Sequence, residues 1–363
     1  MKNLMNIDNK KKKRREAEFY SFRSLLGNSW AIFYFSLGGR EAGKSYDATN
    51  FLVRQWKMYG RPFYWMRLSE TSARKLLMNN AEKLIDPDLR RKYNLDLITN
   101  GDAVYEVLKR EYDHKTKKYK VMEKKLMARV LSLATFYNDK GSGLFDKDFL
   151  DDPKMYYNIV LDEMNREKDE KKSFDIVYAF TNQLENLVRS TKQRVRVICI
   201  GNTLEEASDI LCCFNFIPET FGRFKIKKKR AVIDYIEPNE AYKLRRRGSI
   251  ADILMPEAST FTNMIETDDS LVWSGRLMRP TAIVKFRTTK ETWFCIWDNK
   301  VVAKYNGEQC KTMIAMRPYL DELFNTKLRD GVITLFDSRS LYYKNLITFK
   351  TFQKEMEYLK PRK

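Results

Sequence analysis

The amino-acid sequence predicts an α/β fold whose first domain has a parallel central sheet. Apolar segments with the character of buried strands alternate with helical segments, a glycine-rich loop joins the first strand to the first long helix, and two acidic residues follow a later strand. Apolar runs without alternation are typical of strands covered by helices on both faces. Because open sheets of this kind bind ligands beyond the carboxyl ends of their strands, the loops at that edge are candidate ligand sites.

The first strand, loop and helix follow one another directly. Residues 31–37 (AIFYFSL) are apolar and aromatic, and the loop Gly38–Ser45 comes next. Beyond Lys44, apolar residues recur at helical spacing until Gly60-Arg61-Pro62, which predicts the end of a helix before a strand over Phe63–Arg67. This order predicts one strand–loop–helix–strand unit.

Two further strands of the same sheet are expected later in the chain. Residues 101–135 contain two β-like segments around a Lys-rich turn, which we interpret as an inserted β-hairpin. The α/β pattern resumes with a strand over Tyr157–Glu163, a helix near Ser173–Arg189 and a strand over Val195–Ile200. Three buried strands that alternate with helices predict a parallel sheet.

A second domain is predicted from the length of the chain and from a change in its residue pattern. The 363 residues exceed what a single hydrophobic core usually supports, and they predict about two domains. Beyond about Pro238 a charged segment leads to short β-like runs such as Ala282–Phe286 and Thr292–Trp297. A small β-rich domain is therefore predicted to begin near residue 270.

The charge balance favours an anionic partner. Lysine and arginine number 68 against 48 acidic residues, which gives a formal charge of +20 and indicates nucleic acid or a membrane surface. No run approaches the roughly 18 to 20 apolar residues that span a bilayer, and a signal peptide is not expected. We therefore expect a soluble, intracellular protein.

The five cysteines and the one histidine exclude two classes of site. The cysteines lack the paired spacing of zinc ligands, and His114 lies in a Lys-rich turn, so neither a zinc site nor serine–histidine catalysis is expected. The cysteines are interpreted as small buried hydrophobic residues. They are Cys199, Cys212, Cys213, Cys295 and Cys310.

The glycine-rich loop has the pattern of a phosphate-binding loop, G-x-x-x-x-G-K-S. Glycines let backbone N–H groups approach phosphates, the lysine reaches the β- and γ-phosphates, and the serine hydroxyl is a ligand for Mg²⁺. An apolar strand before it and an amphipathic helix after it favour this interpretation over an ordinary glycine turn. The predicted ATP-binding residues are Gly38, Gly39, Arg40, Glu41, Ala42, Gly43, Lys44 and Ser45.

Two positions inside this loop have unusual charges. Arg40 could alternate between the γ-phosphate and a carboxylate of a partner. A carboxylate facing a triphosphate would be strongly repelled, so Glu41 is expected to point away from it, toward an arginine or a neighbouring subunit.

Asp162 and Glu163 end an apolar strand at the expected ligand-binding edge. Asp162 is predicted to join Ser45 in holding Mg²⁺, and Glu163 to orient and polarise the attacking water. The alternative is a solvated acidic strand end. Together with the phosphate loop, the pair predicts hydrolysis of ATP rather than binding alone.

Three further residues are candidates for the active site. Asn202, after the strand that ends at Ile200, is a candidate sensor of the γ-phosphate or the water, although a turn residue is the alternative. Arg189 is the first choice, and Arg194 the second, for an arginine that stabilises transition-state charge from a neighbouring subunit. The alternative for these arginines is a favourable interaction with a helix C-terminus.

Several basic runs could contact nucleic-acid phosphates without reading the sequence. Taken singly, each run is as readily a solvated face, but together with the charge of +20 some are expected to bind nucleic acid. The runs are Lys10–Arg15, Lys115–Lys125, Lys225–Arg230 and Arg245–Arg247.

Taken together, these motifs resemble those of the DNA-packaging ATPases of phi29-like bacteriophages. The resemblance covers roughly residues 30–240 and rests on Gly38–Ser45, Tyr59-Gly60, Ile159–Glu163 followed by Arg166-Glu167-Lys168, and Arg194–Asn202. It implies a P-loop ATPase domain of the additional-strand, conserved-glutamate (ASCE) class over residues 1–237. A charged helical linker over 238–269 and a small C-terminal domain over 270–363, similar to an RNase H-like nuclease fold without its active site, are expected to follow.

The resemblance also implies a function and partners. The family's loop lysine, metal aspartate, catalytic glutamate and trans-acting arginine correspond to Lys44, Asp162, Glu163 and Arg189. The expected protein is a motor that uses ATP and Mg²⁺ to move double-stranded DNA into a procapsid, as a ring, usually of five subunits, on the portal. It would act in the host cytoplasm at the portal vertex and be absent from the mature virion, and a packaging RNA as adaptor is left open. Glu41, where a relative has glycine, and the longer basic N-terminus depart from the family.

Two alternatives remain at this stage. A large terminase would also cut DNA with carboxylates that hold two metal ions, for which Asp298, Asp321 and Asp337 are candidates without a recognisable spacing. Cleavage of plasmid with Mn²⁺, lost in Asp298→Ala, would support it. The second alternative is a basic nucleic-acid-binding or capsid protein that binds nucleotide without hydrolysing it. Hydrolysis that is lost in Glu163→Gln while binding persists would exclude it.

Overall fold

The computed structural model forms two compact units. It describes residues 19–114, 117–139, 156–165, 174–188, 194–202, 208–218, 220–254, 271–277, 280, 282–285, 292–297, 301–306, 320–322 and 326–359. The first unit comprises Met1–Glu205 and Pro218–Ile265, and the second comprises Glu206–Ile217 and Glu266–Lys363. Among the described helices, none has the length and apolar character needed to cross a membrane.

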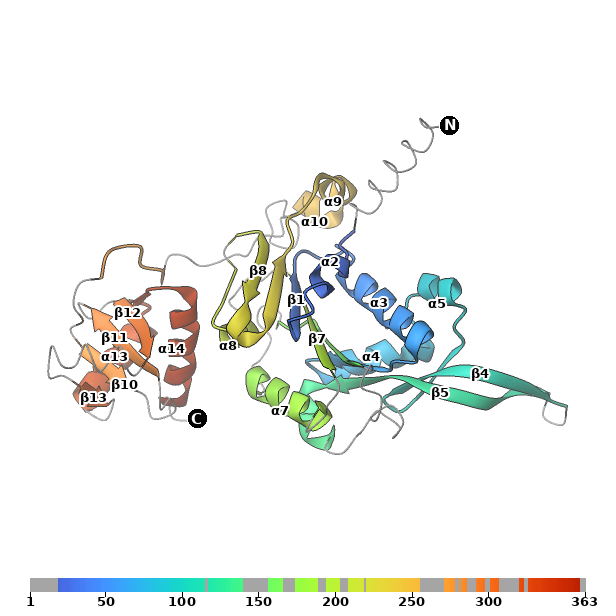
Figure 1. Ribbon diagram of the computed structural model, residues 1–363. Coiled ribbons are helices and arrows are strands. Elements are labelled where there is room, and N and C mark those ends of the chain that lie inside the picture. Colours follow the sequence, from blue (N-terminus) through green and yellow to red (C-terminus); the bar gives the residue numbers. More distant parts are fainter. Residues whose placement is uncertain are drawn as a thin grey trace. The chain divides into compact units, whose positions relative to one another are not determined.

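The first unit is built on a nine-stranded, mostly parallel sheet (Figure 1). The strand order is β3-β4-β5-β2-β6-β7-β1-β9-β8. The strands are β1 (Phe33–Leu37), β2 (Phe63–Arg67), β3 (Leu97–Asn100), β4 (Ala103–Asp113), β5 (Lys118–Ser132), β6 (Tyr156–Asp162), β7 (Arg194–Gly201), β8 (Gly222–Ile226) and β9 (Ala231–Tyr235). The predicted α/β fold with a parallel central sheet is therefore confirmed. One strand, β7, lies between β1 and β6.

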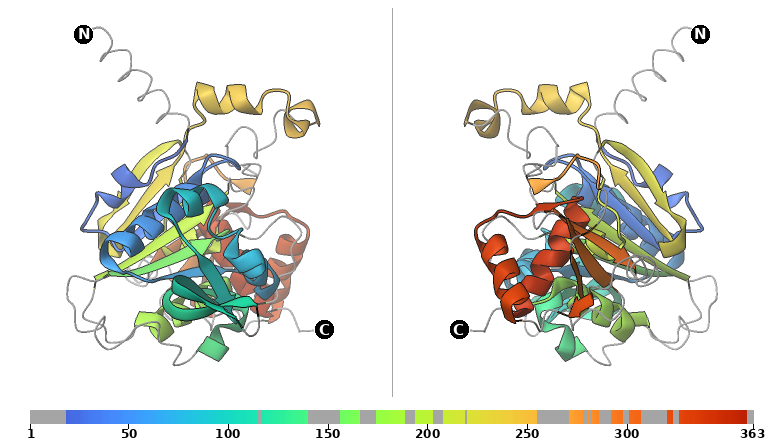
Figure 2. Two further views of the ribbon diagram at one scale, coloured as in Figure 1. Left: turned by 90° about the vertical axis from the view of Figure 1, so that its right-hand side faces the viewer. Right: turned by 90° about the vertical axis from the view of Figure 1, so that its left-hand side faces the viewer.

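Helices and short turns complete the first unit. They are α2 (Arg23–Leu26), α3 (Lys44–Tyr59), α4 (Glu70–Ala81), α5 (Pro87–Tyr93), η1 (Leu133–Asp139), α7 (Ile176–Val188), η2 (Lys227–Lys229), α9 (Glu240–Arg246) and α10 (Ile250–Leu254). Figures 1 and 2 show α9 and α10 at one end of the unit, beyond the ends of the strands.

The core lies on both faces of the central strands. Tyr34, Val160 and Ile198 face a cluster that includes Leu52 and Trp56 of α3. Their neighbours in sequence point to the opposite face, because side chains alternate along a strand. Most of these neighbours are buried too. Burial on both faces explains why the central strands are continuously apolar.

Glycines define both ends of α3. Gly43 precedes the helix with φ of 85°, and Gly60 follows it with φ of 61° and donates its N–H to the Trp56 carbonyl. Such positive φ values cost glycine little, so the helix begins directly after the phosphate loop and ends before β2.

The hairpin of β4 and β5 differs from the expected insertion in two ways. It is longer than its apolar segments predicted, and its base belongs to the central sheet, because β5 pairs in parallel with β2. Met127–Leu131 is mostly buried in that sheet, whereas most residues from Lys118 to Lys125 are exposed. Figure 1 shows the outer part of the hairpin extending away from the rest of the unit.

The second unit contains a five-stranded sheet in the order β13-β10-β11-β12-β14. The strands β10, β11 and β12 form an antiparallel meander, and β13 pairs in parallel with β10. Phe294, Val302, Val332 and Phe352 belong to its core, so helices pack against the sheet. The elements are α8 (Asp209–Cys213), β10 (Ala282–Lys285), β11 (Thr292–Trp297), β12 (Val301–Asn306), β13 (Leu320–Glu322), α13 (Thr326–Asp337), β14 (Tyr342–Tyr343) and α14 (Leu346–Leu359).

The sequence did not predict α13 and α14. The domain boundaries at residues 237 and 269 remain predictions. One expectation about the cysteines was wrong: Cys199 and Cys295 are buried, but Cys213 is exposed at the end of α8. Cys310 lies outside the described residues.

Candidate active site

The predicted phosphate loop connects β1 to α3. The Lys44 side chain folds back over it, and its Nζ donates hydrogen bonds to the carbonyl oxygens of Gly38 at 2.7 Å and Gly39 at 2.6 Å. Lys44 is 4% exposed. Burial lowers the pKa of Lys44 to about 8, and the nearby Asp162 carboxylate acts against that shift. The ammonium group therefore lies within the loop and close to a carboxylate.

A side chain at Gly43 would not fit this loop. A Cβ atom there would lie 3.1 Å from a ring carbon of Phe19, and φ is 85°. Both the conformation and the close approach of Phe19 therefore favour glycine at this position.

The carboxyl end of β6 brings the two predicted acidic residues to the phosphate loop. Asp162 is 2% exposed, and its Oδ1 accepts a hydrogen bond from the Ser45 hydroxyl at 3.1 Å. Burial raises the pKa of the Asp162 carboxyl, and the Arg67 guanidinium opposes this rise. The structure thus brings together Ser45 and Asp162, whose oxygen atoms are of the kind that Mg²⁺ binds.

Arg67, at the end of β2, contacts both acidic residues. Its Nη2 lies 2.7 Å from Oδ2 of Asp162, and its Nη1 forms an ion pair with Glu163. Arg67 is not among the site residues predicted from the sequence. A signal was available, since Arg67 ends a predicted strand of the parallel sheet and therefore lies at the same edge as the carboxylates.

Glu163 follows β6 in a left-handed conformation with φ of 55°. This conformation costs a residue with a side chain about 1 to 3 kcal/mol, and such costs are concentrated at functional sites. Its backbone N–H donates to Oδ1 of Asp162 at 3.1 Å, and its side chain is 52% exposed. Glu163 thus lies beside the buried aspartate with its own carboxylate accessible to water.

Replacing Arg67 by Gln is expected to destabilise the protein by about 3 kcal/mol at pH 8, because Asp162 would keep a buried negative charge without its cation. Since the pKa of Asp162 would rise further in the variant, the penalty should shrink as the pH falls and the carboxyl takes up a proton. Urea unfolding at several pH values measures this. Arg74→Gln, which removes an exposed arginine paired with Glu70, is the control. Equal unfolding free energies for Arg67→Gln and the wild type at pH 8 would contradict the prediction.

Glu41 points to an arginine, as expected from the sequence. Its carboxylate Oε2 lies 3.2 Å from Nη1 of Arg246 in α9 of the same chain. The neighbouring Arg40 is exposed, and its carbonyl oxygen accepts a hydrogen bond from the Tyr242 hydroxyl at 3.0 Å. The basic run Arg245–Arg247 therefore does not form a simple solvated face, because Arg246 is 5% exposed and contacts the phosphate loop.

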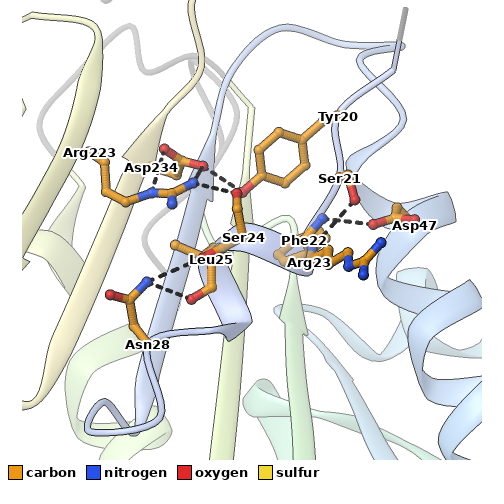
Figure 3. Close-up of polar contacts among 10 residues, drawn as sticks. All are labelled: Tyr20, Ser21, Phe22, Arg23, Ser24, Leu25, Asn28, Asp47, Arg223 and Asp234. Atoms are coloured by element: carbon orange, nitrogen blue, oxygen red, sulfur yellow. Dashed lines mark hydrogen bonds and ion pairs between the residues drawn. The ribbon is translucent and has the colours of Figure 1, made fainter. Parts of the chain in front are cut away.

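The segment before β1 connects the phosphate loop to other elements. The backbone N–H of Tyr20 donates to the Ala42 carbonyl at 2.9 Å. The backbone N–H of Phe22 donates to the Asp47 carboxylate in α3 at 2.7 Å, and the Tyr20 hydroxyl donates to Asp234 of β9 at 2.9 Å (Figure 3). Residues 20–22 thus contact the loop, the helix after it and a strand beside it.

The structure places two of the three further candidates. Asn202 lies directly after β7, and its carbonyl accepts a hydrogen bond from the Asn165 side chain at 3.4 Å. Arg194 begins β7, where its Nη1 donates to the Tyr156 hydroxyl at 3.0 Å. Seven steps of about 3.3 Å separate Arg194 from the strand end at Gly201, so Arg194 lies at the edge opposite the phosphate loop of its own chain. Arg189 lies outside the described residues, and the roles of all three remain predictions.

Two of the three nuclease candidates cannot be placed in the second unit. Asp298 and the side chain of Asp321 lie outside what the structure describes, and Asp337 is exposed. Within the described parts of the chain, no group of three or more His, Cys, Asp or Glu side chains could hold a metal ion.

Comparison with known proteins gives sequence relatives among phage proteins. No family model matches the chain. The DNA packaging proteins of Bacillus phages PZA and phi29 are each 24% identical to it over 211 residues, which is 57% of this chain and 53% of theirs. The chain thus aligns with about half the length of these relatives.

Solved structures extend the similarity in fold to most of the chain. The Phi-28 gp11 DNA packaging motor has a TM-score of 0.62 at 15% identity and covers 95% of this chain and 99% of its own. The bacteriophage Phi-29 viral genome packaging motor assembly has a TM-score of 0.59 at 17% identity, with coverages of 94% and 99%. These comparisons confirm the resemblance to the phi29-like DNA-packaging ATPases and show that the chain shares the fold of those packaging motors.

Proposed function

We propose that this protein hydrolyses ATP to move double-stranded DNA into a viral procapsid. The observation that carries the proposal is the contact of Ser45 with Asp162 at the edge where the phosphate loop, Lys44 and Glu163 also lie. A nucleotide-binding protein without turnover needs the loop but not a carboxylate beside it that is accessible to water. The packaging function is supported by the names of the relatives and by the net charge of +20.

Each residue of the site has a proposed role. The Lys44 ammonium and the N–H groups of the loop bind the β- and γ-phosphates. Ser45 and Asp162 hold Mg²⁺, which neutralises charge that develops on the transferred phosphoryl group. The Glu163 carboxylate orients the attacking water and accepts its proton. Asn202 contacts the γ-phosphate or the water.

The partners follow from the same proposal. A ring, usually of five subunits, would act at the portal vertex in the host cytoplasm, with Arg189, or alternatively Arg194, reaching the nucleotide of a neighbouring subunit. A packaging RNA could join the ring to the portal. Hydrolysis of ATP that increases when double-stranded DNA is added tests this function, and nucleotide binding without any hydrolysis in the presence of DNA would contradict it.

The outer part of the hairpin β4–β5 is proposed to contact DNA phosphates. Lys117, Lys118, Lys120 and Lys124 are exposed there, and the hairpin extends away from the sheet (Figure 1). Some of its charges are paired within the chain, as between Lys109 and Glu111 at 2.6 Å and between Lys120 and Asp113. Lys117 and Lys118, at the turn, are therefore the better candidates for contacts with DNA.

Replacing Lys117 and Lys118 together by Gln is expected to weaken DNA binding and to reduce its salt dependence. The slope of log K against log salt should fall by up to about 0.9 for each lost phosphate contact. Fluorescence anisotropy with a DNA duplex at several salt concentrations measures both effects. A matched variant, Lys75→Gln with Lys83→Gln, removes the same charge from exposed positions near α4. The same slope in both variants would contradict a direct role for the hairpin.

A further inference from the structure

The helix α9 contacts the phosphate loop although about 200 residues separate them in sequence. The Tyr242 hydroxyl donates to the Arg40 carbonyl at 3.0 Å, and Nη2 of Arg245 donates to the Glu41 carbonyl at 2.5 Å. Arg246 forms the ion pair with the Glu41 carboxylate at 3.2 Å. Three side chains of α9 thus bind two consecutive residues of the loop, all within the first unit.

The contacts with α9 also determine where two backbone N–H groups of the loop point. In a planar trans peptide the carbonyl group and the following N–H group point in opposite directions, and the described residues contain no cis peptide bond. Holding the Arg40 carbonyl toward Tyr242 therefore directs the N–H of Glu41 away from α9. Holding the Glu41 carbonyl toward Arg245 directs the N–H of Ala42 away in the same manner.

Such outward-directed N–H groups are what a phosphate loop uses to bind phosphates. The loop also has a conformation that needs support, because Glu41 has φ of 64°, which a residue with a side chain rarely adopts. The ion pair with Arg246 fixes its side chain, and Arg245 is itself held over the Phe19 ring, 4.4 Å from the ring centre.

We propose that Tyr242, Arg245 and Arg246 are positioning residues that set the N–H groups of the phosphate loop for the β- and γ-phosphates of ATP. This inference rests on the proposed function and adds a dependence of ATP affinity on α9. Because coupling between two events is reciprocal, bound nucleotide should in turn hold α9 more firmly on the loop. The segment that follows the sheet would thereby respond to the nucleotide.

Tyr242→Phe removes one donor and keeps the ring, so it is the most direct test. Loss of this hydrogen bond should raise the Kd of Mg·ATPγS and the KM for ATP about three- to tenfold. Because the loop binds the phosphates in the ground state and the transition state alike, kcat should stay within about twofold. Arg245→Gln should likewise raise the KM for ATP and leave kcat nearly unchanged. Lys243→Gln, which removes a lysine paired with Glu240 on the exposed side of α9, should change neither.

A double-mutant cycle tests the ion pair. If Glu41 and Arg246 act through each other, Glu41→Gln with Arg246→Gln should weaken ATPγS binding no more than the stronger single substitution. Hydrogen exchange gives a readout independent of turnover: Mg·ATPγS should slow exchange of the α9 amides in the wild type, and do so less in Tyr242→Phe.

The outcomes separate this inference from the proposed function. An unchanged Kd and KM in both Tyr242→Phe and Arg245→Gln, beside a wild type that binds ATPγS, would overturn the role of α9 alone. A lower melting temperature and kcat with unchanged KM would show that α9 is only structural. A wild type that binds no nucleotide would instead refute the proposed function, and the inference with it.

Discussion

Replacing Glu163 by Gln is expected to leave ATP bound and to reduce its hydrolysis by about 10²- to 10⁴-fold. Gln has nearly the shape of Glu but cannot accept the proton of the attacking water. Lys44 keeps its hydrogen bonds with the loop carbonyl oxygens, and Ser45 keeps its hydrogen bond with Asp162. Affinity for ATPγS should therefore change little while turnover is lost.

Equilibrium binding of a fluorescent ATP analogue and a phosphate-release assay on the same preparation measure the two quantities. Glu185→Gln, at an exposed position of α7, is the matched control and should hydrolyse ATP as the wild type does. Turnover in Glu163→Gln within about tenfold of the wild type would show that another group activates the water.

Arg189→Ala has the second large expected effect, a loss of about 10³- to 10⁵-fold in turnover. If this arginine acts on the nucleotide of a neighbouring subunit, a subunit with Arg189→Ala binds ATP but fails to activate its neighbour. Mixed assemblies should then lose activity more steeply than the fraction of mutant subunits rises. Activity that falls only in proportion to that fraction would contradict action between subunits.

Arg194→Ala provides the comparison for this experiment. Arg194 lies at the opposite edge of the sheet from its own phosphate loop and contacts Tyr156, so it could act on a nucleotide only across a subunit boundary. Arg194→Ala, rather than Arg189→Ala, could make mixed assemblies lose activity more steeply than the fraction of mutant subunits rises. Arg194 would then be the arginine that acts on the neighbouring subunit's nucleotide.

The parts of the site that the sequence predicted are those encoded by local patterns. The loop Gly38–Ser45 carries its own spacing, and an apolar strand that ends in Asp162-Glu163 marks the same edge of a parallel sheet. The rule that parallel strands end at one edge was therefore enough to place these residues near one another. The same rule would have found Arg67, had charged residues at the end of every predicted strand been considered.

Other features depend on pairings between distant residues. The contact of Glu41 with Arg246 joins residues about 200 positions apart, and the sequence predicted an arginine partner without identifying it. The pairing of β5 with β2 followed from no local pattern, because the exposed part of β5 resembles a separate hairpin. The helices α13 and α14 were not predicted, because the second domain was taken to be β-rich from the short β-like runs that precede them.

ATP hydrolysis by this protein is measured directly as release of γ-phosphate from Mg·ATP in a single turnover with double-stranded DNA present. The wild type should release phosphate, and Lys44→Ala should release none, because the buried ammonium of the phosphate loop is missing. A wild-type protein that binds Mg·ATP and DNA but releases no phosphate would contradict the proposed function.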